Sequence, residues 1–426
     1  MSRSTLITGI DIGTTKITCV IGQYFSQEEN LNIVGIASQR ALGFRKGQVV
    51  NIEQAIESIS QTLDATERMG GFSVKEAVVS VSSPQLASLN SRGVVAVANP
   101  NHEIIPEDVE RAIDSAKAVS LPPSREILHV IPRHYSLDGQ EGIVDPVGMA
   151  GTRLELEAHI ITAAAAELKN LTKCLNESGV SVQSLIYSGL ATSEAVLSPT
   201  EKELGVILID IGGSNTCVTV FTEGSPIFST VIPAGSVNIT NDLAIGLRVP
   251  IEAAEKIKLY LSELDPQKEE PDEIDFQKMG LENFDKKTLS WQTAVSGIIR
   301  PRSEEIAQLI AQQLKDQNLL DQVPAGLVIT GGGSLTVGIK EIFGQILNLP
   351  VRTAQPPSLG GIADELASPT QASTLGLVLY YKKILEQTGG KSTFHSSSFR
   401  VPKIGKTIPF KGLLEKIKNN IKPLLP

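Results

Sequence analysis

The chain has 426 residues, 41% of them hydrophobic, and a formal net charge of −9 at pH 7. This length allows two or more domains with sizeable cores, and the acidic balance argues against a dedicated nucleic-acid-binding protein. No apolar run reaches bilayer-spanning length and no signal peptide is evident, which predicts a cytosolic protein. The cysteines Cys19, Cys174 and Cys217 lack metal-site spacing, and we expect Cys19 and Cys217 to lie in the core.

The first predicted element is a β-hairpin whose turn carries the sequence IDIGTTK at residues 10–16. An apolar run before the turn and residues 17–21 after it supply the two strands. Successive backbone N–H groups in a glycine turn form an anion-binding concavity, and Thr14, Thr15 and Lys16 can add donors to phosphate oxygens. An ordinary hairpin turn explains this one segment equally well.

The following region predicts a small α+β insertion. Strand-like runs occur at 78–81, 93–97, 127–132 and 155–161, and a helix is expected over 106–119, with proline at its start and acids in its first turns. The histidines His129, His134 and His159 could form a metal set. Their strand positions and the lack of clustered carboxylates favour a structural role instead.

A second turn, IDIGGSN at residues 209–215, repeats the frame of the first and precedes a return strand at 216–221. Two such turns predict two similar half-domains that face each other across a cleft and present both turns to one polyphosphate. Asp11 and Asp210 would repel phosphate, so we expect them to hold Mg²⁺, through its waters, because Mg²⁺ dehydrates reluctantly.

Two further segments could complete this cleft. A helix is expected over 251–264, and its Glu255 and Lys258 either reach the ribose and base edge or form an exposed ion pair. The strand 327–330 runs into TGGGS at 330–334, followed by an amphipathic helix over 337–347. A strand, a glycine loop and a helix start can bind a base and ribose, although the P-loop pattern is absent. Another helix is expected from 298 to about 317.

These segments together give the candidate nucleotide-binding residues, which are Asp11, Gly13, Thr14, Thr15, Lys16, Asp210, Gly212, Gly213, Ser214, Asn215, Gly235, Glu255, Lys258, Gly331, Gly332, Gly333 and Ser334.

The end of the chain differs in composition from the rest. Residues 391–426 carry a net charge of +7 on an otherwise acidic protein. Residues 389–409 predict a flexible linker, and an amphipathic helix follows within 410–426. A short basic amphipathic helix suits an anionic membrane surface. Docking on the protein's own core or on a calmodulin-like partner are the alternatives. The candidate anchor residues are Phe410, Lys411, Leu413, Leu414, Lys416, Ile417, Lys418 and Ile421.

The order of the two Asp-Ile-Gly turns and the TGGGS loop resembles the superfamily of actin, the heat-shock chaperone ATPases and the sugar kinases. Within it, the chain resembles the FtsA family of bacterial cell-division proteins. The most specific stretches are LHVIPRHY at 128–135, QEGIVDPVG at 140–148, YSGLATSEAVL at 187–197 and IIRPRSEEI at 298–306.

The resemblance implies an α/β, actin-like, two-lobed ATPase fold with an α+β subdomain 1C in place of actin's 1B. Its expected subdomains are 1A at 1–82, 166–195 and 369–388; 1C at 83–165; 2A at 196–240 and 320–368; and 2B at 241–319. The linker 389–409 and the amphipathic helix 410–426 complete the chain.

The resemblance also implies ATP and Mg²⁺ in the cleft, head-to-tail self-assembly on the cytoplasmic face of the cell membrane at the division site, and tethering of FtsZ through its C-terminal peptide. Arg300 and Arg302 match the region that contacts this peptide, and 1C would meet other divisome proteins. Two departures stand out: the second turn reads GGSN, and Ser188-Gly189 replaces the Glu-Pro that opens the connecting helix in MreB and in chaperone-like relatives. We therefore expect slow hydrolysis at most, with ATP acting mainly as a clamp that sets cleft closure.

Two alternative functions are a small-molecule kinase and a pilus-assembly protein. A small-molecule kinase of the same superfamily would need a general base and a substrate pocket, for which the sequence offers no constellation. A pilus-assembly relative would share the fold, but the terminal amphipathic helix favours the division protein.

Overall fold

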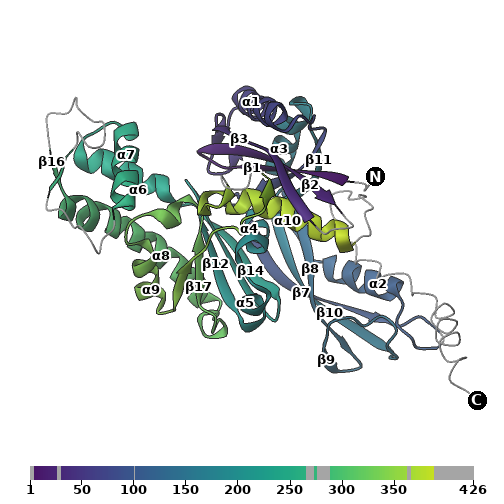
Figure 1. The fold of residues 1–426 in the computed structure, drawn as a ribbon. Helices are drawn as coiled ribbons and strands as arrows, with labels where there is room; N and C mark the ends of the chain where they lie inside the picture. The colour runs from purple at the N-terminus through teal and green to yellow at the C-terminus, as the bar shows by residue number, and fades with distance from the viewer. Residues whose placement is uncertain are drawn as a thin grey trace, which may run out of the picture.

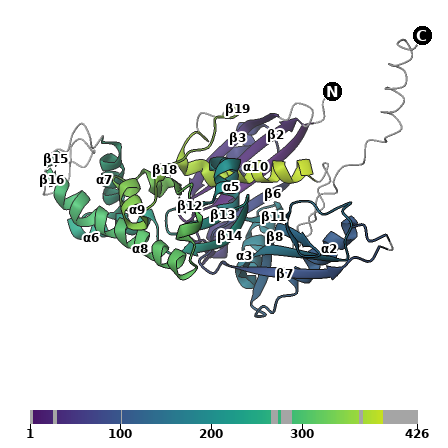
Figure 2. The same cartoon turned by 90° about the horizontal axis from the view of Figure 1, so that it is seen from below.

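The computed structural model describes residues 4–25, 30–99, 101–264, 273–275, 288–361 and 366–387. They form two lobes and an insertion (Figure 1). Seen from below, the insertion with α2 and β7 lies towards one end of the molecule, and the helices α6, α7 and α8 lie towards the other (Figure 2). The predicted linker and amphipathic helix, residues 389–426, lie outside the described residues.

The first lobe is built on a six-stranded sheet of order β11-β6-β1-β2-β3-β19. Alternate side chains of β1 and β2 enter two cores on opposite faces, one shared with α1 and α3 and the other with α10 and α4. The bounds are β1 Ser4–Ile12, β2 Lys16–Phe25, β3 Asn30–Arg40, β6 Glu76–Val81, β11 Ser181–Tyr187, β19 Gly360–Gly361, α1 Ile52–Gly70, α3 Ala165–Glu177, α4 Ser188–Val196 and α10 Ala372–Gln387, with a small β4 (Phe44–Arg45) and β5 (Gln48–Val49) pair beside them.

The insertion leaves the first lobe after β6 and returns at α3. Its antiparallel sheet has the order β7-β10-β8-β9, and α2 packs on one face. Gly93 is needed at that contact, because a Cβ there would lie 2.0 Å from the carbonyl oxygen of Ala112. The bounds are β7 Ala87–Ala96, α2 Pro106–Lys117, β8 Arg125–Leu137, β9 Gln140–Ile143 and β10 Arg153–Ala164.

The second lobe has a five-stranded sheet of order β14-β13-β12-β17-β18. One face packs on α8 and α9, and the other packs on α4 and on residues near α5. The bounds are β12 Val206–Ile211, β13 Thr216–Thr222, β14 Ser225–Ile232, β17 Leu327–Thr330, β18 Val351–Thr353, α5 Pro199–Leu204, α8 Arg300–Asp316 and α9 Ile339–Leu347. Short 3₁₀ turns cover Leu320–Gln322, Gly332–Leu335 and Pro369–Gln371.

A separate helical part completes this lobe. It consists of α6 (Ser236–Leu247), α7 (Ile251–Glu263) and a π-helical segment, Gln292–Ile299, which share their own core. The small β15 (Glu273–Asp275) and β16 (Thr288–Ser290) pair lies at its end. The helix expected from residue 298 thus begins earlier, as a π segment that continues into α8 at Arg300.

Most of the predicted elements are present. Both Asp-Ile-Gly segments are hairpins, with β1 antiparallel to β2 and β12 antiparallel to β13. The helix expected over 337–347 begins two residues later, at Ile339, and the helix expected to end at 119 ends at Lys117. Cys19 and Cys217 are buried, as expected for core residues. Within the described residues, no helix combines the length and the apolar character needed to cross a membrane.

Candidate functional site

The two Asp-Ile-Gly turns have the same local geometry. In the first, the Gly13 N–H donates to the Lys16 carbonyl at 3.0 Å, and in the second, the Gly212 N–H donates to the Asn215 carbonyl at 2.9 Å. A Cβ added to either glycine would lie within 3 Å of that same carbonyl oxygen. Each turn therefore requires glycine at this position, which explains why the sequence repeats it.

The turns face each other across a cleft. A Cβ added at Gly213 would lie 2.8 Å from the Thr15 methyl carbon, so the tips of the two turns nearly touch. The cleft holds a cavity of about 380 Å³. Thirteen of the seventeen predicted residues line it, namely Asp11, Gly13, Thr14, Thr15, Lys16, Asp210, Gly212, Gly213, Asn215, Glu255, Lys258, Gly331 and Gly332.

The four other predicted residues are not in the lining. A Cβ on Gly235 would lie 2.6 Å from carbonyl oxygens of the second turn, and one on Gly333 would lie 2.2 Å from the Ile211 side chain. The Ser334 hydroxyl donates to the Gly331 carbonyl at 2.7 Å. These three residues therefore support the loops, and Ser214 is half-buried in the second turn without lining the cavity.

The two aspartates line the cavity, and each accepts a hydrogen bond from a hydroxyl on a helix that joins the lobes. The Ser373 hydroxyl on α10 donates to Asp11 at 3.0 Å, and the Thr192 hydroxyl on α4 donates to Asp210 at 2.8 Å. Burial, and secondarily the charge of Asp11, raises the pKa of Asp210 to about 6. Two carboxylates that interact electrostatically and line one cavity suit a divalent cation.

Lys16 and Lys258 supply positive charge to the same cavity. Burial lowers the pKa of Lys16, although the nearby Asp11 opposes this effect. Lys258 is buried on α7 and donates to Glu255 at 2.8 Å and to the Thr240 hydroxyl at 2.9 Å. The Glu255–Lys258 ion pair is therefore present, but only in part exposed: the Lys258 ammonium group is buried in the cleft wall, while the Glu255 side chain is 43% exposed.

Sequence reasoning missed ten lining residues, among them Ser82 and Leu259. The Asn215 amide group donates to the Ser82 carbonyl at 2.6 Å and so connects the second turn with the first lobe. Its buried Oδ1 has no hydrogen-bond partner among the described residues. The other missed lining residues are Ser188, Cys217, Ser236, Val237, Leu335, Pro369, Thr370 and Ser373.

The histidines of the insertion make hydrogen bonds within the protein. His129 accepts from the Tyr187 backbone N–H at 3.0 Å, and His159 contacts the Asn90 amide oxygen and the Ser229 hydroxyl. No group of three or more possible metal ligands occurs among the described residues.

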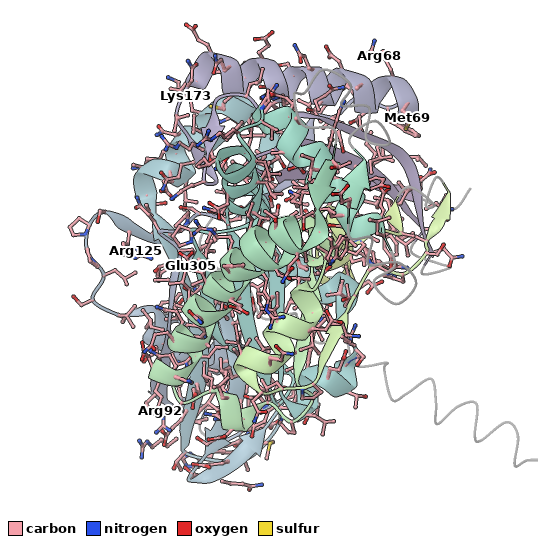
Figure 3. All side chains as sticks on the ribbon, turned by 90° about the vertical axis from the view of Figure 1, so that its left-hand side faces the viewer. Arg68, Met69, Arg92, Arg125, Lys173 and Glu305 are labelled. Atoms are coloured by element: carbon pink, nitrogen blue, oxygen red, sulfur yellow. The ribbon has the colours of Figure 1, made fainter. Side chains whose placement is uncertain are left out.

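Arg300 and Arg302 begin α8, away from the cavity. Arg302 pairs with Asp242 at 2.5 Å and with Glu305, and Arg300 pairs with Glu304 at 2.8 Å. Figure 3 places Glu305 on the helix that faces the viewer. The helical spacing predicts the pairs with Glu304 and Glu305, whereas the pair with Asp242, 60 residues away, has no signal in the sequence.

Chemically, the cavity combines glycine-turn N–H groups and two lysines with a pair of carboxylates. The N–H groups and ammonium groups suit phosphate oxygens, and the carboxylates suit a cation. The described lining offers Asp11, Asp210 and Glu255 as its only carboxylates, and Ser188, not an acid, begins α4 beside it.

Comparisons with known proteins agree with this architecture. The profile of the SHS2 domain inserted in FtsA matches residues 84–162, and the profile of cell division protein FtsA matches residues 207–376. The PilM–PilN type IV pilus biogenesis complex is similar in fold, with a TM-score of 0.61 at 15% identity over 88% of this chain and 98% of that one. MreB5 of Spiroplasma citri bound to AMPPNP gives a TM-score of 0.52 at 14% identity over 98% and 99% of the chains, and the fold is therefore actin-like.

Similarity in sequence is much higher to proteins of bacterial division. Cell division protein FtsA of Pseudomonas aeruginosa is 36% identical over 92% of this chain and 93% of its own length. FtsA of Borreliella burgdorferi is 38% identical over 89% and 91%. Because both matches extend over nearly the whole of each chain, the protein belongs to the FtsA family of actin-like cell division proteins.

Proposed function

We propose that this protein binds ATP with Mg²⁺ between its lobes and uses the bound nucleotide to set the shape of a filament subunit. One observation carries the proposal: two glycine turns from different lobes meet in a single cavity that two aspartates also line. Solved structures of MreB5, which share the fold, contain ADP and AMPPNP.

The residues of the cavity fall into three groups, which suit the phosphates, the ribose and base, and the cation. The turns at Gly13–Lys16 and Gly212–Asn215 would hold the phosphates, and Gly331, Gly332, Glu255 and Lys258 would surround the ribose and base. Asp11 and Asp210 would hold Mg²⁺ through its waters, and the ion would neutralise phosphate charge. The raised pKa of Asp210 supports this assignment, since a cation stabilises the ionised form of a carboxylate pair.

Hydrolysis is expected to be slow. Orienting an attacking water calls for an acceptor near the end of the phosphate chain. The helix that begins beside the cavity starts with Ser188, whose hydroxyl donates to the Val81 carbonyl at 3.2 Å. Glu255 already accepts from Lys258 and Thr240. ATP therefore acts mainly as a clamp.

The wider role follows from the family and from the tail composition. We propose that the chain assembles head to tail on the cytoplasmic face of the membrane at the division septum and anchors FtsZ filaments there. The basic amphipathic segment 410–426 would bind anionic lipid, and 1C would meet other divisome proteins. The FtsZ C-terminal peptide would contact Arg300 and Arg302, exchanging its carboxylates for Glu304, Glu305 and Asp242.

Steady-state ATP turnover tests the scaffold proposal against a kinase. The full chain with Mg-ATP should turn over slowly, and sugars or other small acceptors should not accelerate it. Rapid acceptor-dependent turnover would overturn the proposal.

Liposome pelleting tests the membrane anchor independently. Anionic liposomes should pellet the full chain, and deletion of 410–426 or Leu413→Glu should abolish pelleting. A matched change on the other face, Glu415→Gln, should leave it intact. Pelleting of the deletion variant would show the anchor assignment to be wrong.

A further inference from the structure

The insertion belongs to the first lobe by chain connection but also contacts the second. It leaves β6 of the first lobe and returns to α3 of the same lobe. Its sheet nevertheless lies beside the edge strand β14 of the second lobe, and β7, β8 and β10 all contact that strand. The insertion therefore spans both lobes.

A row of side chains bridges the two edge strands where they meet. The Ser88 hydroxyl on β7 donates to the Ser229 carbonyl at 2.8 Å and accepts from the Ser229 N–H at 2.9 Å. The Asn90 amide group donates to the Ile227 carbonyl at 3.1 Å. β14 is an edge strand, so its outward N–H and C=O groups have no neighbouring strand to pair with among the described residues. The side chains of Ser88 and Asn90 supply these hydrogen-bond partners instead.

The centre of this contact, at His159 and Ser229, is buried. His159 on β10 lies 3.0 Å from the Ser229 hydroxyl and 2.7 Å from the Asn90 amide oxygen, and the His159 side chain has no exposed surface. Separating β7 from β14 would break the His159–Ser229 contact and both Ser88–Ser229 hydrogen bonds, while the His159–Asn90 contact would stay within the insertion. Each broken hydrogen bond favours the closed contact over the open, hydrated one, so the contact resists opening.

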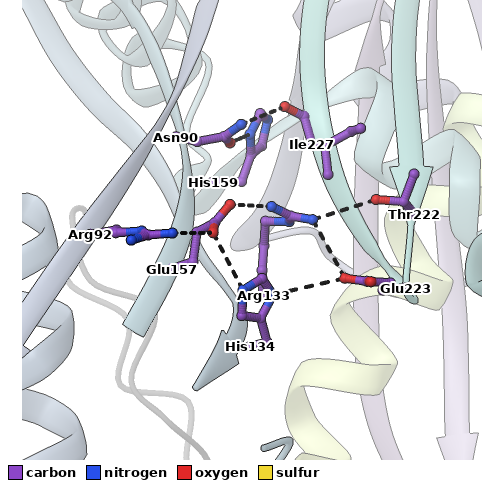
Figure 4. Close-up of polar contacts among 9 residues, drawn as sticks. All are labelled: Asn90, Arg92, Arg133, His134, Glu157, His159, Thr222, Glu223 and Ile227. Carbon is purple, nitrogen blue, oxygen red and sulfur yellow. Dashed lines mark hydrogen bonds and ion pairs between the residues drawn. The ribbon is translucent and has the colours of Figure 1, made fainter. Parts of the chain in front are cut away.

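Charged groups extend the contact towards the β13–β14 turn (Figure 4). Arg133 on β8 pairs with Glu157 within the insertion, donates to the Thr222 hydroxyl at 3.4 Å and lies 3.9 Å from the Glu223 carboxylate. His134 lies between the carboxylates of Glu157 and Glu223, at 3.4 and 3.9 Å. We call the whole set, Ser88, Asn90, Arg133, His134, Glu157 and His159 against Thr222, Glu223, Ile227 and Ser229, the interlobe latch.

A second connection to the second lobe lies at Tyr187, where α4 begins. Its N–H donates to His129 of the insertion, and its hydroxyl, with one proton to donate, lies 3.1 and 3.0 Å from the carbonyl oxygens of Val218 and Thr230. Tyr187 thus links the insertion and the second lobe at a point separate from the latch.

We propose that the interlobe latch limits opening of the cleft, so that nucleotide occupancy and the position of the insertion are thermodynamically coupled. The inference rests on the proposed function in that the cleft ligand is a nucleotide. Opening moves the second lobe away from the first and must break the latch or pull the insertion with β14. By reciprocity, any ligand that stabilises the closed cleft stabilises the latch, and a partner that pulls the insertion from β14 promotes nucleotide release.

Nucleotide release kinetics provide the test. The full chain carrying Ser88→Ala and Ser229→Ala, small changes remote from the cavity lining, loses three of the latch hydrogen bonds. We expect a fluorescent N-methylanthraniloyl ATP analogue, bound with Mg²⁺, to dissociate about tenfold faster from this variant. A tenfold change corresponds to about 1.4 kcal/mol.

Two control variants come from the same strand. Ser91→Ala changes a serine on the opposite face of β7, and Arg92→Ala removes an exposed side chain whose 4.0 Å ion pair with Glu157 stays within the insertion. Figure 3 shows Arg92 at the edge of the molecule. Both controls should keep the wild-type release rate within about twofold.

A distance measurement in nucleotide-free protein separates the latch from the nucleotide proposal. Spin labels at Arg68→Cys on α1 and Gln312→Cys on α8, both exposed, report on the two lobes, and the native cysteines are buried. The Ser88→Ala/Ser229→Ala change should broaden the interlobe distance distribution.

If that pair fails to fold, Asn90→Ala replaces it, since the Asn90 side chain is exposed. Unchanged release and an unchanged distance distribution would overturn the inference. Failure of the wild type to bind the analogue would overturn the proposed function and leave the distance test valid.

Discussion

Neutralising Asp210 should make the nucleotide-free protein more stable while abolishing its Mg-dependent binding of ATP. Burial raises the pKa of this carboxyl from 3.8 to about 6, so ionising it at pH 7.5 costs about 3 kcal/mol of folding stability. Asp210→Asn removes that cost, and the amide oxygen can still accept from the Thr192 hydroxyl. We expect the free energy of unfolding, measured with urea in chelator, to rise by up to about 3 kcal/mol.

The pH dependence has a definite sign. Because the folded-state pKa is raised, the carboxyl contributes its stability below pH 3.8 and loses it as pH rises through about 6. The gain from Asp210→Asn should therefore shrink below pH 6 and vanish near pH 4. Asp64→Asn, at an exposed position on α1, should change stability by less than about 0.5 kcal/mol. A less stable Asp210→Asn protein that still binds Mg-ATP normally would refute the reasoning.

Gly331→Ala should weaken nucleotide binding at least tenfold in calorimetry, because the new Cβ would lie 2.3 Å from an Asp210 oxygen and the residue has a φ of 82°. Gly332→Ala should weaken binding much less, because its Cβ would lie 3.6 Å from the nearest atom, on Thr370. Equal effects of the two variants on binding would contradict this geometry. Burial lowers the pKa of His129 to about 4 and of His159 to about 3. Keeping these imidazoles neutral in the folded state therefore stabilises the protein fully above about pH 6.5. Below that pH the free energy of unfolding falls, by about 1.4 kcal/mol for each histidine at pH 5.5. In urea unfolding, His159→Gln should remove about half of the fall in unfolding free energy that the two histidines cause between pH 7.5 and 5.5. A pH profile of stability identical to that of the wild type would contradict this prediction.

The sequence was most informative where function depends on local chemistry. Both Asp-Ile-Gly hairpins were predicted because glycine, aspartate and flanking β-branched residues specify a turn within a few positions. The strands of the insertion were also predicted, from strand-like apolar runs within single short segments. Sequence reasoning also predicted that Asp11 and Asp210 would share one site, since the repetition itself implied two facing halves.

Contacts between distant segments could not be predicted. Ser88 and Ser229 are 141 residues apart, and Asn215 and Ser82 are 133 apart, with no local signal in either pair. The sequence left open whether Lys258 faces the cleft or solvent, because spacing on a helix does not reveal which face is covered. The π-helical segment before Arg300 was also missed, since the apolar residues there fit an ordinary helix equally well.

Electron microscopy of the full chain on anionic lipid monolayers tests the central claim most directly, because it reports membrane attachment and assembly together. With Mg-ATP, ordered filaments should cover the monolayer; without nucleotide, or after deletion of 410–426, they should be absent. Isolated particles under every condition, or identical filaments with and without ATP, would contradict the account.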